Sequence, residues 1–236
     1  MKKEKKKKSF RLLGFLFESK TSLFLIGSNC FVFWYILNYS IEEEVLSRFI
    51  LYPGNLLNGE FLCLLTSGFI HFDISHLLWN MLAVFIFARI VERNLGITKT
   101  LIIYFGALTI SMLFSTGVYV FVLHKNVAII GASGAVMGLL ATAMLLEPFC
   151  FTYEMILPIP VMVKGWMFFY ADIKGFMSNE NDGVSHLAHL FGFLSIALLV
   201  YFLSNRDRKL LRTGLFINII SFITFLLLRN WLIQKL

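Results

Sequence analysis

The stretch Ile130-Gly131-Ala132-Ser133-Gly134-Ala135-Val136 opens an apolar run that continues without a charge to Leu146. Glycines permit backbone angles and close approaches that other residues forbid, so they can expose a serine hydroxyl at a tight turn into a helix. The free N–H groups at the start of a helix can also stabilise an oxyanion. Small residues at this spacing would equally let two helices pack closely in lipid. The stretch alone therefore indicates either a nucleophilic serine or a helix-packing face.

The composition indicates a membrane protein. Of the 236 residues, 58% are hydrophobic and only 15% are charged, whereas about a quarter of a soluble domain is charged. The net charge of +7 does not indicate a nucleic-acid partner, because the basic residues lie where a membrane topology would put them. The lysine-rich residues 1–20 predict a basic cytoplasmic tail. The three cysteines predict neither a disulfide nor a metal site.

Seven segments are long and apolar enough to be membrane-spanning helices, which need about 20 residues. These segments are 21–39, 74–91, 100–122, 130–146, 158–175, 186–204 and 213–232. The predicted fold class is therefore all-α, a polytopic membrane helical bundle. The long connection over 41–73 is apolar enough to lie in the membrane interface.

The distribution of basic residues predicts the orientation. Fifteen of the 21 lysines and arginines fall on the side of the N-terminal tail and five on the other, with Lys164 left unassigned. The N-terminus should therefore be cytoplasmic and the C-terminus outside. In this orientation Ser133, His189, His76 and Asn80 all lie at one depth near the outer face.

Placing a polar residue inside a membrane costs free energy, so such residues are functional candidates by default. His189 is followed one turn later by Gly192, which would let this helix press against the helix that carries Ser133. An imidazole is the usual base for a serine nucleophile, although a histidine bonded between helices is the structural alternative. No aspartate is expected to orient His189, so a Ser–His dyad is predicted, and Asp172 is interpreted as a cap or loop tether.

His76 and Asn80 stand four residues apart and project from one helix face. Side-chain donors in this arrangement can stabilise an oxyanion; the alternative is a polar clamp between helices. His71 precedes this helix and could orient the loop, whereas Glu92 at its other end is interpreted as a structural anchor. His186 and His189 would form half of a metal site, but no third ligand is evident, so neither a metal nor a cofactor is expected.

Three separated motifs together resemble the rhomboid family of intramembrane serine proteases. They are His71-x4-His76-x3-Asn80, Gly131-Ala132-Ser133-Gly134 and Ala188-His189-x2-Gly192, with a weaker fourth in Glu92-x3-Gly96. The resemblance implies Ser133 as the nucleophile and His189 as the base. It also implies an oxyanion hole formed by His76, Asn80 and the backbone N–H of Ser133. His71, Glu92, Gly131, Gly134 and Gly192 would support the site.

The resemblance covers 21–204 and implies a six-helix protease core there, followed by a cytoplasmic turn and one further transmembrane helix over 205–236. Three positions depart from the family pattern. Leu62-Cys63 replaces a Trp-Arg pair, Ala88 replaces a glycine ahead of Glu92, and Ile196 replaces the second glycine of the sixth-helix motif.

The implied activity is hydrolysis of peptide bonds in transmembrane protein substrates, within the lipid bilayer and without nucleic acid. Substrates would reach the site between helices 74–91 and 158–175, where Trp79 and Trp166 are bulky enough to line a gate, although lipid-facing packing would also suit them. The alternative is a catalytically inactive rhomboid-like protein that binds or routes transmembrane helices. Such a protein generally lacks the serine or the histidine. A transporter would require paired charges at the midplane, which the sequence does not offer.

Overall fold

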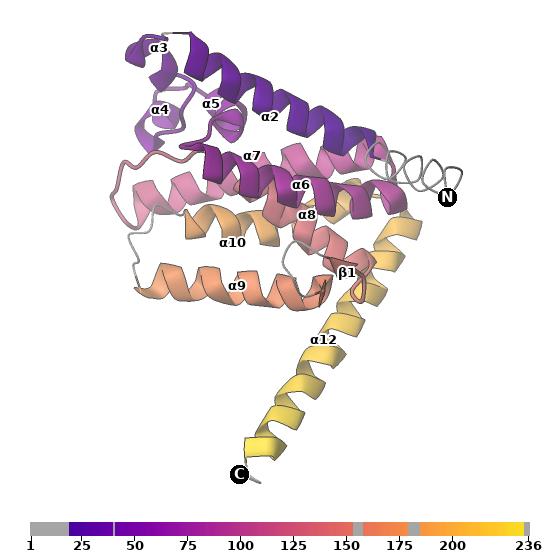
Figure 1. Ribbon diagram of the computed structural model, residues 1–236. Coiled ribbons are helices and arrows are strands. Elements are labelled where there is room, and N and C mark those ends of the chain that lie inside the picture. Colours follow the sequence, from indigo (N-terminus) through magenta and orange to yellow (C-terminus); the bar gives the residue numbers. More distant parts are fainter. Residues whose placement is uncertain (1–18, 40, 153–157, 179–184, 234–236) are drawn as a thin grey trace, which may run out of the picture.

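Four helices among the described residues are long and apolar enough to cross a membrane, so the chain is a multi-pass membrane protein. They are α2 (Lys20–Asn38), α6 (Ile74–Leu95), α7 (Ile97–Phe121) and α12 (Asn205–Ile233). The computed structural model describes residues 19–39, 41–152, 158–178 and 185–233, with side chains to 228 (Figure 1). The predicted basic tail lies outside these residues except for Ser19 and Lys20.

The remaining predicted spans form shorter helices. These are α8 (Ser133–Leu146), α9 (Val161–Ser178), and a broken segment of α10 (His186–Leu194), α11 (Ile196–Leu199) and η2 (Val200–Phe202). Helix α9 carries three charged residues, Lys164, Asp172 and Lys174, within 18 residues, and it is not among the four helices that are long and apolar enough to cross a membrane.

Several boundaries differ from the predictions: α6 ends four residues later, and α7 and α12 start three and eight residues earlier. Helix α8 starts three residues later than predicted, because residues 130–132 form the turn that leads into it. Helix α9 also starts three residues later, because β2 (Ile159–Pro160) pairs antiparallel with β1 (Phe151–Thr152). The described residues are therefore mostly helical, as predicted, and add one small strand pair to the helical bundle.

Helix α8 is the centre of the bundle. It packs against α6, α7, α9, α10 and α12, and nearly all of its residues are buried. A helix that is apolar on every side can be stable only when other helices surround it. At 1.5 Å per residue, the 14 residues of α8 extend about 21 Å, which is less than the ~30 Å hydrocarbon thickness of a bilayer.

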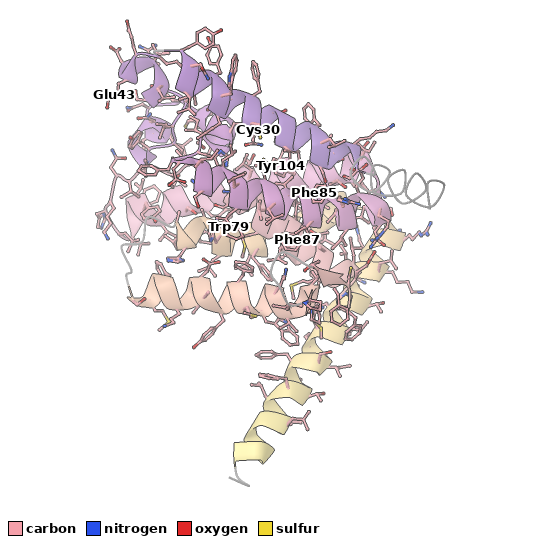
Figure 2. The ribbon with its side chains drawn as sticks, in the orientation of Figure 1. Cys30, Glu43, Trp79, Phe85, Phe87 and Tyr104 are labelled. Atoms are coloured by element: carbon pink, nitrogen blue, oxygen red, sulfur yellow. The ribbon has the colours of Figure 1, made fainter. Side chains whose placement is uncertain are left out.

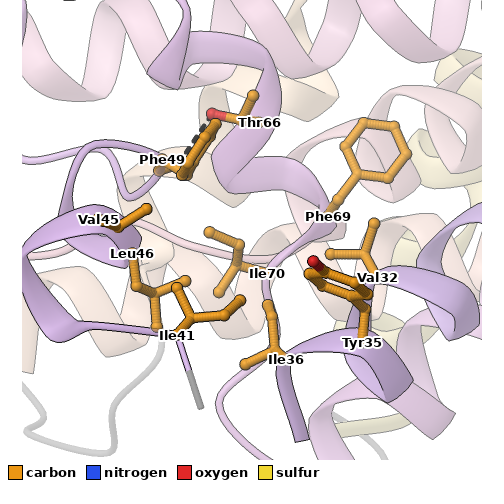
Figure 3. A pocket seen from close by; sticks show the side chains of 10 residues that line it. All are labelled: Val32, Tyr35, Ile36, Ile41, Val45, Leu46, Phe49, Thr66, Phe69 and Ile70. Atoms are coloured by element: carbon orange, nitrogen blue, oxygen red, sulfur yellow. Dashed lines mark hydrogen bonds between the residues drawn. The ribbon is translucent and has the colours of Figure 1, made fainter. Parts of the chain in front are cut away.

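The connection between α2 and α6 folds into short helices: α3 (Glu43–Ser47), α4 (Pro53–Leu57), α5 (Cys63–Thr66) and η1 (Ser67–Phe69). With the end of α2 it lines an open apolar pocket of about 500 Å³ (Figure 3). Thr66 closes one side by donating its hydroxyl to the carbonyl of Phe49 at 2.9 Å. Cys63, at one of the departures from the family pattern, is fully buried and its thiol donates to the carbonyl of Glu60.

Helix α12 is attached to the central helix at only one end. The buried side chain of Asn218 donates to the carbonyl of Met144 in α8 at 2.9 Å. Four residues further along, Phe222 packs against Trp166 of α9. Towards its C-terminal end α12 runs away from the other helices (Figure 1), and most of its apolar side chains there are exposed. Exposed apolar side chains on a spanning helix suit contact with lipid.

Glu92 near the end of α6 holds the start of α2. Its carboxylate accepts hydrogen bonds from the Ser19 hydroxyl and from the backbone N–H groups of Lys20 and Thr21 at 3.2 and 2.9 Å. The first N–H groups of a helix have no partner within the helix, and a negative charge there is favourable. Glu92 thus caps a helix 70 residues away in the sequence, which suits the anchoring role predicted for it.

Replacing Glu92 with alanine should destabilise the fold by about 1–2 kcal/mol, the usual effect of losing a helix cap. Thermal unfolding in detergent measures this. Glu44→Ala is the matched control, because Glu44 pairs with Arg48 and both side chains are largely exposed; its effect should stay below about 1 kcal/mol. Equal effects of the two variants would show that Glu92 does not anchor α2.

Candidate active site

The turn before α8 requires a glycine at position 131. Gly131 has a φ of +100°, a backbone conformation that side-chain-bearing residues rarely adopt. A Cβ atom at this position would lie 2.6 Å from Nε2 of His76. The Gly131 N–H donates to the carbonyl of Ser67 at 2.9 Å, which fixes the turn against η1. Gly131 therefore brings the first residues of α8 directly beside the His76 ring.

Ser133 is the first residue of α8 and is partly exposed. In the part of the chain that the structure describes no side chain caps this helix, and the first backbone bond within it runs from the Val136 N–H to the carbonyl of Ala132. The N–H groups of residues 133–135 therefore have no acceptor within the helix. Such groups can stabilise negative charge that develops near the Ser133 hydroxyl.

The hydrogen bonds of His76 determine which ring nitrogen carries its proton. The backbone N–H of Phe72 donates to Nδ1 of His76 through a long bond of 3.4 Å. A nitrogen that accepts a hydrogen bond is unprotonated, so a neutral His76 carries its proton on Nε2. Since Nε2 is the His76 atom nearest the Cβ position of Gly131, His76 presents an N–H donor to the turn before Ser133.

Asn80 lies one turn beyond His76 and is buried. One N–H of its amide donates to the carbonyl of His76 at 2.9 Å. An amide nitrogen has two N–H groups, so this bond leaves the second for another acceptor. The two donors predicted from the sequence thus share a helix face.

Helices α8 and α10 meet backbone to backbone. A Cβ atom at Gly192 would lie 2.1 Å from the carbonyl oxygen of Gly134, and one at Gly134 would lie 3.4 Å from the carbonyl oxygen of Ala188. Ser133 directly precedes the contact on α8, and His189 lies between the two contacting positions on α10. The close approach therefore brings the turn of α10 that carries His189 beside the start of α8, where the turn at Gly131 meets the His76 ring.

The prediction that no aspartate orients His189 is wrong. Nδ1 of His189 lies 2.9 Å from Oδ1 of Asp172, a buried residue on α9. The same oxygen lies 2.9 Å from Nδ1 of His186. Asp172 is therefore neither a cap nor a loop tether. The signal available in the sequence was a carboxylate at membrane depth, where an unpaired charge is costly.

His186 occupies a different environment from His189. A Cβ atom on Gly175 of α9 would lie 2.3 Å from Nε2 of His186. The His186 ring thus fills the contact between α9 and α10, one turn of α9 beyond Asp172. This position suits a packing role better than that of a base for Ser133.

His71 lies beneath the site, buried before the start of α6. Its ring centroid is 5.0 Å from that of His76. Burial, and then the neighbouring His76, lower the pKa of His71 to about 4. His71 is therefore neutral near pH 7 and acts as a packed element of the loop.

The two tryptophans proposed as gate residues have different surroundings. Trp79 on α6, labelled in Figure 2, is 62% exposed. Trp166 on α9 packs edge-on against Phe222 of α12, with ring centroids 5.3 Å apart. Trp166 is therefore held by the C-terminal helix, whereas Trp79 is free to contact lipid or another helix.

Replacing Gly192 with alanine should destabilise the protein by about 1–3 kcal/mol, because the new methyl group meets backbone that cannot rotate away. Gly27→Ala in α2 is the matched control, since nothing lies within 4 Å of its Cβ position. Alanine is the better helix former, so this control should stabilise the protein by up to about 1 kcal/mol. Thermal unfolding of both variants tests the contact, and a harmless Gly192→Ala would contradict it.

Acidification should destabilise the protein through His71. The pKa of His71 is 6.5 unperturbed and about 4 in the fold, so between these values the unfolded chain binds a proton that the folded protein does not. Neutral His71 therefore contributes fully to the free energy of unfolding above pH 6.5. This contribution, at most about 3 kcal/mol, is lost as the pH falls towards 4. The free energy of unfolding of His71→Gln should therefore change less between pH 7 and pH 5 than that of the wild type. His124→Asn, at an exposed histidine, should keep the wild-type dependence; the idea fails if His71→Gln also keeps it.

Comparison with known proteins identifies the family. The Rhomboid domain matches residues 58–206, which is more than half of the chain. The chain is 29% identical over 190 residues to RHOMBOID-like protein 12, mitochondrial, of Arabidopsis thaliana, covering 72% of this chain and 54% of that protein. It therefore spans about half the length of the plant relative. It is also 29% identical over 172 residues to the Putative rhomboid protease YdcA of Bacillus subtilis strain 168, covering 72% of this chain and 82% of that protein.

The matched domain runs from the end of α4 to the start of α12. It includes the turn at Gly131, the contact between Gly134 and Gly192, and both histidines bonded to Asp172. The predicted resemblance is thereby confirmed at the level of the family: this chain belongs to the rhomboid family.

Proposed function

We propose that this protein is an intramembrane serine protease that hydrolyses peptide bonds in or near the transmembrane segments of other membrane proteins. Membership of the rhomboid family supports this activity, since these proteins are typically serine proteases of the membrane. The observation that carries the proposal is the backbone contact between Gly134 and Gly192. It brings the helix start at Ser133 beside the turn of α10 that holds His189.

In the proposed reaction Ser133 is the nucleophile and His189 the general base. The Ser133 oxygen attacks the carbonyl carbon of the substrate while His189 accepts the hydroxyl proton. When the tetrahedral intermediate collapses, His189 gives this proton to the departing amine. A water molecule then attacks the acyl-enzyme with the help of His189, which releases the second product and restores Ser133.

The oxyanion would be held by donors from two helices. The Nε2–H of His76 faces the turn before Ser133, and the backbone N–H of Ser133 has no acceptor within α8. Asn80 would contribute its second amide N–H from the same face of α6. Donors fixed in place before the reaction stabilise developing charge most effectively, because they need no reorganisation.

The length of α8 supports a site below the membrane surface. A helix of about 21 Å leaves roughly 9 Å of hydrocarbon thickness unspanned, and water could reach Ser133 through this space. We assign the six-helix core to residues 21–204, and a cytoplasmic turn with a seventh transmembrane helix to residues 205–236. The distribution of basic residues favours a cytoplasmic N-terminus and an active site near the extracytoplasmic face.

Substrates would be membrane proteins whose spanning helix unwinds easily near its outer end. Each peptide carbonyl within a helix is already hydrogen-bonded and shielded by lipid. Small or helix-breaking residues lower the cost of exposing a carbonyl to Ser133. Substrates would approach between α6 and α9, past Trp79 and Trp166.

A fluorophosphonate probe should label the purified protein at Ser133, because it reacts with activated serines. Ser133→Ala and His189→Ala should abolish both labelling and cleavage of a transmembrane substrate, whereas His76→Ala should slow cleavage about 10²–10³-fold. Ser28→Ala is the control: its hydroxyl is bonded to the carbonyl of Phe24 in α2, far along the chain from the site. This variant should be labelled by the probe and should cleave the substrate as the wild type does.

The result that contradicts this proposal is a folded wild-type protein that neither reacts nor cleaves. That outcome would favour the alternative function, an inactive rhomboid-like protein that binds or routes transmembrane helices. Labelling of a different serine would show that the nucleophile is that serine and not Ser133.

A further inference from the structure

We propose that Asp172 is a positioning residue that holds the imidazole of His189 in the one tautomer able to accept the Ser133 proton. The inference rests on the proposed function and extends its catalytic pair to a chain of Asp172, His189 and Ser133. The three residues come from three different helices, α9, α10 and α8.

The geometry assigns the protons. A carboxylate oxygen can only accept a hydrogen bond, so the 2.9 Å contact between Oδ1 of Asp172 and Nδ1 of His189 requires a proton on Nδ1. A neutral imidazole with its proton on Nδ1 has its lone pair on Nε2. Nε2 is then the nitrogen left to accept the serine proton. In the other tautomer Nε2 would carry a proton and could not act as a base.

The burial of Asp172 stabilises this hydrogen-bonded arrangement. The side chain of Asp172 is only 6% exposed, and a buried charge must be hydrogen-bonded or paired to be tolerated. Swinging the carboxylate away from the two imidazoles would leave it without these partners in an apolar region. The burial of Asp172 therefore restricts the rotation of the His189 ring as well as its tautomer.

His186 is the second support of the same carboxylate. Its Nδ1 lies 2.9 Å from the oxygen that contacts His189, and the three-residue spacing puts both histidines on one face of α10. The ring of His186 is pressed against Gly175 of α9. This gives a physical reason for two histidines in the sixth-helix segment: His186 fixes Asp172, and Asp172 fixes His189.

Asp172 also faces the charge that forms during the reaction. When His189 accepts the serine proton it becomes an imidazolium, whose Nδ1–H points at the Asp172 carboxylate. A buried carboxylate in this position stabilises the imidazolium, as in serine hydrolases with three-membered catalytic sites. The effect is larger during the reaction than before it, so loss of Asp172 should lower kcat rather than raise KM.

The competing explanation is that Asp172 only joins α9 to α10. A joining role predicts that substitutions at Asp172 lower stability and that any loss of activity follows the loss of folded protein. A positioning role predicts a change in the His189 tautomer and in kcat while the protein remains folded. The two explanations are separated by measuring the tautomer directly.

The first experiment uses ¹⁵N-labelled histidine and magnetic resonance in lipid, in a Ser133→Ala background that needs no activity. The His189 signals are assigned by their absence in His189→Gln. We expect His189 to carry its proton on Nδ1 when Asp172 is present and to shift toward the Nε2–H form in Asp172→Leu. A proton on Nε2 with Asp172 present, or an unchanged tautomer in Asp172→Leu, would overturn the inference. The first of these results needs no variant at Asp172 and stands even if Asp172→Leu does not fold.

The second experiment measures kcat and KM with a transmembrane substrate. Asp172→Leu should lower kcat about 100-fold or more with little change in KM. Lys174→Leu is the matched control, because it removes an exposed charge from the same helix and should leave kcat unchanged. A folded Asp172→Leu with wild-type kcat would overturn the inference while leaving the protease activity established. A wild type that does not react with the fluorophosphonate would instead contradict the proposed function, and the resonance experiment would still test Asp172.

Discussion

The limited length of α8 is the constraint on which the rest of the structure depends. Because this helix is about 21 Å long and almost completely buried, it cannot cross the bilayer as an independent span. Neighbouring helices must supply the apolar surroundings that lipid supplies elsewhere. The arrangement of α6, α7, α9, α10 and α12 around α8 follows from this requirement. The start of the helix thereby lies beside the His76 ring of α6, and the part of α10 packed against it carries His189, which is bonded to Asp172 of α9.

Those polar groups form two networks with opposite roles. On the α6 side, the hydrogen bond from Phe72 gives His76 a donor facing the turn at Gly131. On the α9 side, the bond to Asp172 puts the proton of a neutral His189 on Nδ1 and leaves Nε2 unprotonated. The partner of Nδ1 thus gives the two histidines opposite hydrogen-bonding properties. The proposed hydrolysis would use both, a donor for the oxyanion and an acceptor for the serine proton.

Much of this could be predicted from the sequence, because the signals were local. The small residues around Ser133, the spacing of His76 and Asn80, and Gly192 after His189 each describe one helix and its neighbour. Asp172 was missed because its role depends on which face of α9 turns toward α10, and packing rather than local pattern decides that rotation. The β1–β2 pair was missed because two residues per strand are too few to show a period of two.

The contact between α8 and α10 also determines how the chain can vary. A side chain at position 192 would meet the backbone of Gly134, where no side chain exists to be made smaller. No second substitution at position 134 can therefore make room for the first. At Gly138, by contrast, the nearest obstacle is the side chain of Ala107 on α7, so a change there has a partner that could be reduced. No single second substitution can therefore compensate for a side chain at position 192. Only a shift of a whole helix would accommodate one.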